Sequence, residues 1–169
     1  MEGGPVVTDA GRWVERLGLV PHPEGGWVRE TYRSPEVVAA AHLPARFGGD
    51  RSFATMIYYL LEGDDFSALH RIKQDEGWHF YDGSPLTLHL ISPEGAYSTR
   101  RLGLGDGMEP QALAPAGWYF AATVDEASFS LVGCTVAPGF DFADFEMPSP
   151  AELLGAYPHL GAVIGRLTR

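Results

Sequence analysis

Short apolar stretches separated by turns recur along most of the chain and predict many short β-strands. Residues 66–72 and 76–81 alternate in polarity, so each is expected to be a strand with one face toward an interior. Residues 51–61 are mostly apolar and aromatic, which is typical of a strand covered on both faces. Further strands are expected at 27–33, 86–91, 96–102, 111–113, 118–123, 129–136 and 141–145. This number of strands predicts a jelly-roll barrel.

Helix signals stand only near the two ends of the sequence. Thr8 or Asp9 can cap a short helix that Gly18 would end. Residues 149–152, Ser-Pro-Ala-Glu, form a capping box with proline at the first helical position, so a second short helix is expected to begin there. The fold class is therefore all-β dominated, with short N- and C-terminal helices.

Size and charge limit the possible functions. The 169 residues fit one domain, residues 1–169, and the 21 glycines and 13 prolines are spread without forming a linker. The net charge of −10 argues against nucleic acid and against acidic membrane surfaces as partners. The chain shows no membrane-spanning apolar run and no signal peptide. The single cysteine, Cys134, fits a reducing compartment, so a cytoplasmic location is expected.

Candidate chemistry centres on His70 and Glu76. A turn at 73–75 would make the two alternating strands a hairpin that brings Glu76 back over His70. A carboxylate beside an imidazole fixes the tautomer and raises the basicity of the ring, which makes a general base for neutral pH. The alternative is a buried structural pair in which the two groups satisfy each other. His22 lies in a loop and is expected to be solvated.

The spacing of His70, Glu76 and Gly83 resembles the first metal-binding motif of the cupins, with Ile72 in place of the second histidine. Residues 115–117, Pro-Ala-Gly, match the second motif and put Phe120 where the last metal-binding histidine would be. Of the four metal ligands that the resemblance implies, this sequence has only two, His70 and Glu76. We therefore expect no metal and no cofactor.

Longer segments narrow the resemblance. The chain is similar to the fifth cupin family, small single-domain cupins labelled as a domain of unknown function, through five blocks at 21–34, 55–61, 75–83, 115–122 and 133–146. This resemblance implies a cupin double-stranded β-helix, which is a jelly-roll barrel, with a ligand-sized cavity and homodimeric assembly. It implies no particular reaction.

Site residues follow by analogy with metal-free cupin epimerases. His70 would be the base, Glu76 would orient it, and Tyr58 is the candidate acid. Glu24 and Arg29 belong to a dense group of charges that either closes the pocket or forms a solvated strand face. The aromatic residues that would line the barrel, as ligand contacts or as core, are Phe66, Trp78, Phe80, Trp118 and Phe120.

Three functions follow from this site. The first is binding of a small polar metabolite or sugar-like ligand with metal-independent epimerase or isomerase chemistry. The second is a non-catalytic small-molecule or carbohydrate-binding cupin. The third, disfavoured by Ile72 and Phe120, is a metal-dependent oxygenase or isomerase.

Overall fold

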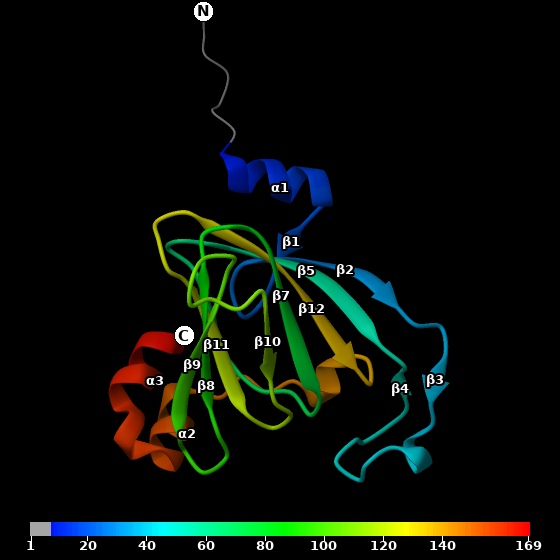
Figure 1. The fold of residues 1–169 in the computed structure, drawn as a ribbon. Coiled ribbons are helices and arrows are strands. Elements are labelled where there is room, and N and C mark those ends of the chain that lie inside the picture. Colours follow the sequence, from blue (N-terminus) through cyan, green and yellow to red (C-terminus); the bar gives the residue numbers. More distant parts are fainter. Residues whose placement is uncertain (1–7) are drawn as a thin grey trace, which may run out of the picture.

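Two antiparallel sheets face each other in the computed structural model, which describes residues 8–169 (Figure 1). The larger sheet has the order β1-β2-β5-β12-β7-β10 and the smaller one β6-β11-β8-β9, while β3 and β4 form a separate pair. The strands are β1 (Val20–Pro21), β2 (Trp27–Arg33), β3 (Val37–Val38), β4 (Arg51–Ser52), β5 (Thr55–Glu62), β6 (Phe66–His70), β7 (Asp75–Gly83), β8 (Leu86–Ile91), β9 (Tyr97–Leu102), β10 (Gln111–Ala114), β11 (Tyr119–Val124) and β12 (Phe129–Ala137). The jelly-roll prediction is confirmed.

Short helices stand at both ends of this β-structure, as predicted. α1 (Asp9–Leu17) precedes the strands, and η2 (Phe142–Asp144), α2 (Pro150–Ala156), η3 (Pro158–Leu160) and α3 (Gly161–Leu167) follow them. One further short helix, η1 (Ala40–His42), lies between β3 and β4. The Thr8 side chain accepts a hydrogen bond from the Gly11 N–H at 3.1 Å, and Gly18 ends α1 with φ 62°. Ser149 and Glu152 form the complete capping box of α2. None of the helices within residues 8–169 is long and apolar enough to cross a membrane.

The segment 141–145 is not the strand that its alternation predicted. Residues Phe142–Asp144 form the 3-10 turn η2, because the Asp141 side chain accepts a hydrogen bond from the Ala143 N–H at 2.8 Å. Such a local side-chain bond favours a turn over a strand. The consequence is a compact strap, residues 138–148, between β12 and α2.

The helices α1, α2 and α3 pack against the outer faces of the sheets and leave the interior for side chains. Buried residues of α2 and α3, Leu153, Ile164 and Leu167, pack with Leu69 and Ile91 of the smaller sheet. The interior itself is filled with large aromatic side chains, of which Trp78 and Phe120 are fully buried with ring centroids 6.2 Å apart. Burial of these rings gives the barrel its principal apolar core.

A buried histidine near α3 predicts how stability depends on pH. His89 of β8 contacts the Tyr97 hydroxyl at 2.7 Å through Nδ1 and the Thr123 hydroxyl at 2.9 Å through Nε2. Burial, and then the charge of Arg166, lowers the pKa of His89 to about 4. In the unfolded chain His89 therefore binds a proton near pH 6.5, whereas in the folded protein it binds this proton only near pH 4.

The contribution of His89 is thus fully present above pH 6.5 and is lost as the pH falls toward 4. We expect the free energy of unfolding of the wild type, relative to that of His89→Gln, to drop by roughly 3 kcal/mol between pH 7 and pH 4. Urea unfolding of both proteins across this range measures it. If the free energies of unfolding of the two proteins changed with pH in parallel, the pKa of His89 would be the same in the folded and the unfolded state.

Candidate functional site

A pocket of about 170 Å³ lies at one end of the barrel interior, between the β1–β2 turn and the strap. Its ionisable lining residues are His22, Glu24, Glu30, His70, Glu76 and Cys134. The remaining wall is largely apolar and comes from both the barrel and the strap: Val28, Ile57, Ile72, Val136, Phe140, Phe142 and Phe145. Charged groups in an apolar pocket of this kind are a common sign of a functional site.

The tight turn between β1 and β2 places Glu24 over the pocket. The His22 N–H donates to the Gly26 carbonyl at 2.9 Å, and Gly26 has φ 74°. A Cβ atom at Gly26 would lie 2.7 Å from the Leu60 carbonyl oxygen, so only glycine lets the turn pack this closely against β5. The Glu24 side chain is thereby turned inward and buried.

Glu24 and His70 form a buried ion pair. Glu24 Oε2 lies 2.9 Å from His70 Nε2, and His70 Nδ1 lies 2.7 Å from the Ala68 carbonyl oxygen. Burial raises the pKa of Glu24, but the charge and hydrogen bond of His70 outweigh it and the net pKa is lowered. Burial lowers the pKa of His70, but Glu24 outweighs it and the net pKa is raised. Each ring nitrogen of His70 faces an acceptor, the Glu24 carboxylate or the Ala68 carbonyl, and this geometry favours the imidazolium with both nitrogens protonated.

The His22 side chain lines the pocket and is only 14% exposed, so the expectation that it is solvated was wrong. Its Nδ1 accepts a hydrogen bond from the Glu24 N–H at 3.2 Å. Burial is the largest influence on His22 and lowers its pKa, which keeps this ring neutral. The pocket thus contains one charged and one neutral histidine. The sequence signal for both residues was their position in one Pro- and Gly-rich turn, residues 21–26, Pro-His-Pro-Glu-Gly-Gly.

Glu76 enters the pocket from the opposite sheet and does not pair with His70. The predicted β6–β7 hairpin is wrong, because β6 pairs with β11 whereas β7 pairs with β12 and β10. Burial raises the pKa of Glu76 to about 7, an effect that the charge of His70 opposes and the charge of Glu24 reinforces. Beside it, the Cys134 thiol is buried and its pKa is raised well above the ordinary value, so the thiol is neutral. Glu76 is therefore a carboxyl group that exchanges its proton near neutral pH.

Two other predicted residues lie outside the pocket. Tyr58, the candidate acid, points to the other face of β5, where it packs in the cluster beneath α1 and meets the Tyr81 ring. Arg29 is exposed and donates to the Leu17 carbonyl at 2.9 Å, so it holds α1 and does not close the pocket. The alternation along β2 and β5 accounts for both placements, since Val28 and Ile57 take the inward positions.

The predicted aromatic residues are divided among three environments. Phe120 lies against His70, with ring centroids 4.1 Å apart, and Trp78 stacks edge-on behind it. Phe80 and Trp118 pack at the margin of the core without lining the pocket. Phe66 lies outside, beneath the guanidinium of Arg169 at 4.3 Å. The aromatic wall of the pocket is instead built by Phe140, Phe142 and Phe145 of the strap.

The donor set does not fit the metal centre of a metallocupin. Ile72 and Phe120 fill two ligand positions with hydrocarbon, and Phe120 is the Cα partner of His70 across β6 and β11. Across residues 8–169, no three His, Cys, Asp or Glu side chains are arranged to hold an ion. Two residual ligands would bind a transition metal weakly.

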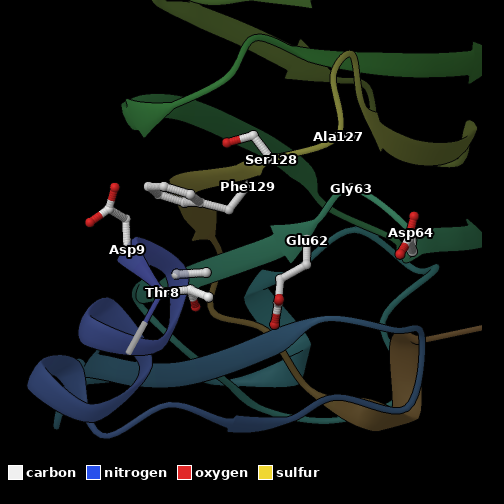
Figure 2. A pocket seen from close by; sticks show the side chains of 9 residues that line it. Thr8, Asp9, Glu62, Gly63, Asp64, Ala127, Ser128 and Phe129 are labelled. Atoms are coloured by element: carbon white, nitrogen blue, oxygen red, sulfur yellow. The ribbon is translucent and has the colours of Figure 1, made fainter. Parts of the chain in front are cut away.

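A larger and more open hollow, of about 340 Å³, lies between the start of α1 and the β5–β6 turn (Figure 2). Its lining includes three acidic residues that are exposed to solvent, Asp9, Glu62 and Asp64. Exposed carboxylates are well hydrated and have no need of a ligand. The barrel pocket is therefore the better candidate for chemistry.

The paired antiparallel sheets with a pocket at one end of their shared interior define a cupin barrel. Residues 11–148 match the model of the family described as "Cupin superfamily (DUF985)", and the chain belongs to this family. An uncharacterised protein of Saccharomyces cerevisiae is 28% identical over 138 residues, which span 75% of this chain and 68% of that protein.

Solved structures support the same assignment. A protein of Shewanella oneidensis is 42% identical with a TM-score of 0.82, over 93% of this chain and 95% of that one. A hypothetical protein from Leishmania major is 36% identical with a TM-score of 0.85, over 92% and 96%. Oxalate decarboxylase from Bacillus subtilis is 14% identical with a TM-score of 0.54, over 87% of this chain and 36% of that one, a likeness of fold alone.

Proposed function

We propose that the barrel pocket binds a small polar metabolite and that Glu76 transfers a proton to and from its carbon skeleton without a metal, as in an epimerase or isomerase. One observation carries this proposal. A buried carboxyl group with a pKa of about 7 shares an apolar pocket with a preformed Glu24–His70 ion pair. A general base works best when its pKa lies near the operating pH, and burial supplies that condition here.

The geometry favours a different division of roles from the one that the sequence suggested. His70 has no free nitrogen to accept a proton, because Nδ1 is bonded to Ala68 and Nε2 to Glu24. Its positive charge is instead fixed beside the pocket, where it would stabilise negative charge that develops on a substrate. Glu24 holds His70 in this state, and Glu76 is the group that exchanges a proton.

Glu76 alone carries out both proton transfers of the proposed step. Its carboxylate takes the proton from a carbon next to a carbonyl group, and the electron pair of the C–H bond moves to form an enolate. The protonated Glu76 then returns a proton and a carbonyl re-forms. Return to the same carbon gives exchange alone, whereas return to the neighbouring carbon of an enediol gives isomerisation. In heavy water the returned proton is replaced by deuterium, whether or not net conversion occurs.

Pocket size limits the substrate class. A volume of about 170 Å³ corresponds to roughly six water molecules at about 30 Å³ each. It lies below the roughly 300 Å³ at which pockets for drug-sized ligands begin. The pocket suits a keto acid, hydroxy acid or single sugar ring, and a nucleotide sugar would have to leave its nucleotide outside.

Deuterium exchange tests the proposal without knowledge of the reaction. Keto acids, hydroxy acids and monosaccharides are incubated with the protein in heavy water and analysed by proton NMR. We expect exchange at one carbon of at least one compound, and a loss of about 10²–10⁴-fold in its rate for Glu76→Gln. Glu109→Gln is the matched control, since Glu109 is an exposed carboxylate paired with Arg100. Equal exchange rates for wild type and Glu76→Gln would refute the role of Glu76.

A second candidate function is ligand binding without turnover. It is favoured by the strap phenylalanines, since Phe142 is 61% exposed at the pocket edge although it belongs to the aromatic wall. Under this alternative a compound binds, shows no deuterium exchange, and binds Glu76→Gln as well as the wild type. Its affinity would fall for Phe142→Ala, measured by calorimetry.

We infer from the family resemblance that the chain forms a homodimer. Within one chain β2 already pairs with β5, so this edge of the sheet is formed without a strand from a second copy. Tyr32 and Met56 are Cα partners in that pairing and are both exposed, and we expect a second copy to cover them. Light scattering after size exclusion is expected to give twice the 18.4 kDa of one chain, and a lower mass for Met56→Lys. A monomeric wild type at micromolar concentration would contradict the inference.

A further inference from the structure

We propose that Arg169 is a positioning residue for the Glu24–His70 pair, acting through the backbone of the turn that carries Glu24. The inference deepens the proposed function because it concerns the same site. It requires only the ion pair itself and no particular substrate. Arg169 follows α3 and is 145 residues from Glu24 along the chain.

The Arg169 guanidinium contacts three groups around this turn. Nε donates to the Glu24 carbonyl at 3.3 Å, and Nη2 donates to the Phe66 carbonyl at 2.6 Å and to Asp65 Oδ1. The guanidinium also stacks on the Phe66 ring at 4.3 Å. A planar fork with several donors is suited to holding two carbonyls and a carboxylate at once.

Asp65 extends this arrangement to the other side of the turn. Its Oδ2 accepts a hydrogen bond from the Gly26 N–H at 2.7 Å, so Asp65 bridges Arg169 and the residue two positions after Glu24. A Cβ atom at Gly25 would overlap both the Phe66 carbonyl oxygen and the Arg169 guanidinium. The turn therefore packs directly against Arg169, and the contact leaves no space for a side chain at Gly25.

The backbone of Glu24 is in turn tied to the strand that carries His70. The Glu24 carbonyl accepts a hydrogen bond from the Ala68 N–H at 2.9 Å, and the Ala68 carbonyl contacts His70 Nδ1 at 2.7 Å. One continuous path thus runs from Arg169 through the Glu24 carbonyl to both partners of the ion pair. Loss of Arg169 frees this end of the turn, which lets the Glu24 carboxylate move from His70 Nε2.

The inference is tested by titrating His70 by NMR of the imidazole nitrogens in Arg169→Ala. The charged or titratable groups that face His70 are Glu24 and His22 from the turn and Glu76 from β7, and none of them is altered by this change. We expect the apparent pKa of His70 to fall by about one unit, because it loses part of its contact with Glu24. Arg169→Lys should restore at most part of the shift, since one ammonium group cannot bind all three acceptors.

Two further variants separate positioning from simple stability. Asp65→Asn removes the charge that pairs with Arg169 and should shift His70 in the same direction by a smaller amount. Arg101→Ala breaks a comparable surface pair with Asp125, at 2.6 Å, and should leave His70 unchanged. If Arg169→Ala lowers the melting temperature as Arg101→Ala does but leaves the His70 titration at its wild-type value, Arg169 has only a structural role. That result would leave the proposed chemistry of Glu76 standing.

Discussion

Replacing Asp144 with alanine is expected to destabilise the folded protein by roughly 3–5 kcal/mol. Asp144 is fully buried, and its two oxygens accept hydrogen bonds from Arg51 Nε and Nη2, each at 2.7 Å. Gln74 Nε2 donates to the same carboxylate at 2.8 Å. Without Asp144 the buried guanidinium of Arg51 loses its counter-ion while it stays cut off from water. Breaking one side of a buried ion pair has this large cost for that reason.

The same change should also weaken ligand binding. Asp144 anchors the strap, and the strap supplies Phe140, Phe142 and Phe145 to the pocket. Glu146→Ala is the matched control, because Glu146 lies two residues away and pairs with Arg71 at 2.6 Å but is 51% exposed. We expect this control to cost no more than about 1 kcal/mol. Urea unfolding compares the two, and equal losses of stability would contradict the proposed anchoring of the strap by Asp144.

Replacing Glu24 with glutamine is expected to remove a pH-dependent part of the stability. The lowered pKa of Glu24 contributes stability that is present above about pH 4.5 and is lost as the pH falls through the folded pKa. The raised pKa of His70 contributes stability that is fully present below pH 6.5 and is lost as the pH rises through the folded pKa. The ion pair therefore stabilises the protein most between pH 4.5 and pH 6.5.

The difference in unfolding free energy between wild type and Glu24→Gln should follow this window. We expect a maximum of roughly 1.5–3 kcal/mol, the range for hydrogen bonds to charged groups. Glutamine keeps the size of the side chain and can still donate to a neutral His70, so the variant should fold. Glu30→Gln, at the pocket edge and paired with Arg33 on the surface, is the control. A difference that does not vary with pH would show that Glu24 and His70 are not an ion pair.

Local patterns in the sequence predicted the fold well because the elements are specified by nearby residues. The capping residues Thr8 and Gly18 bounded α1 correctly, Ser149 marked the start of α2, and alternation marked most strands. The site was predicted only in part. His70, Glu76 and Glu24 do share one pocket, and Tyr58 and Arg29 do not.

The pairing within the site could not be predicted because it depends on contacts between distant segments. Strands β6 and β7 are adjacent in sequence, yet they belong to opposite sheets, so spacing along the chain did not show which carboxylate meets His70. Glu24 contacts His70 from a turn that lies 46 residues earlier in the chain. The strap phenylalanines were missed for a local reason, since an Asp141 cap replaces the expected strand with a turn.

The most direct test of the account is the titration of Glu76 itself. Carbon-13 NMR of protein labelled at the glutamate carboxyl carbons, with the signal assigned by its loss in Glu76→Gln, follows this single group. We expect a midpoint near pH 7, because burial opposes ionisation of Glu76 more strongly than the charge of His70 favours it. A midpoint below pH 5 would mean that burial does not raise the pKa of Glu76, and it would contradict the proposed proton transfer.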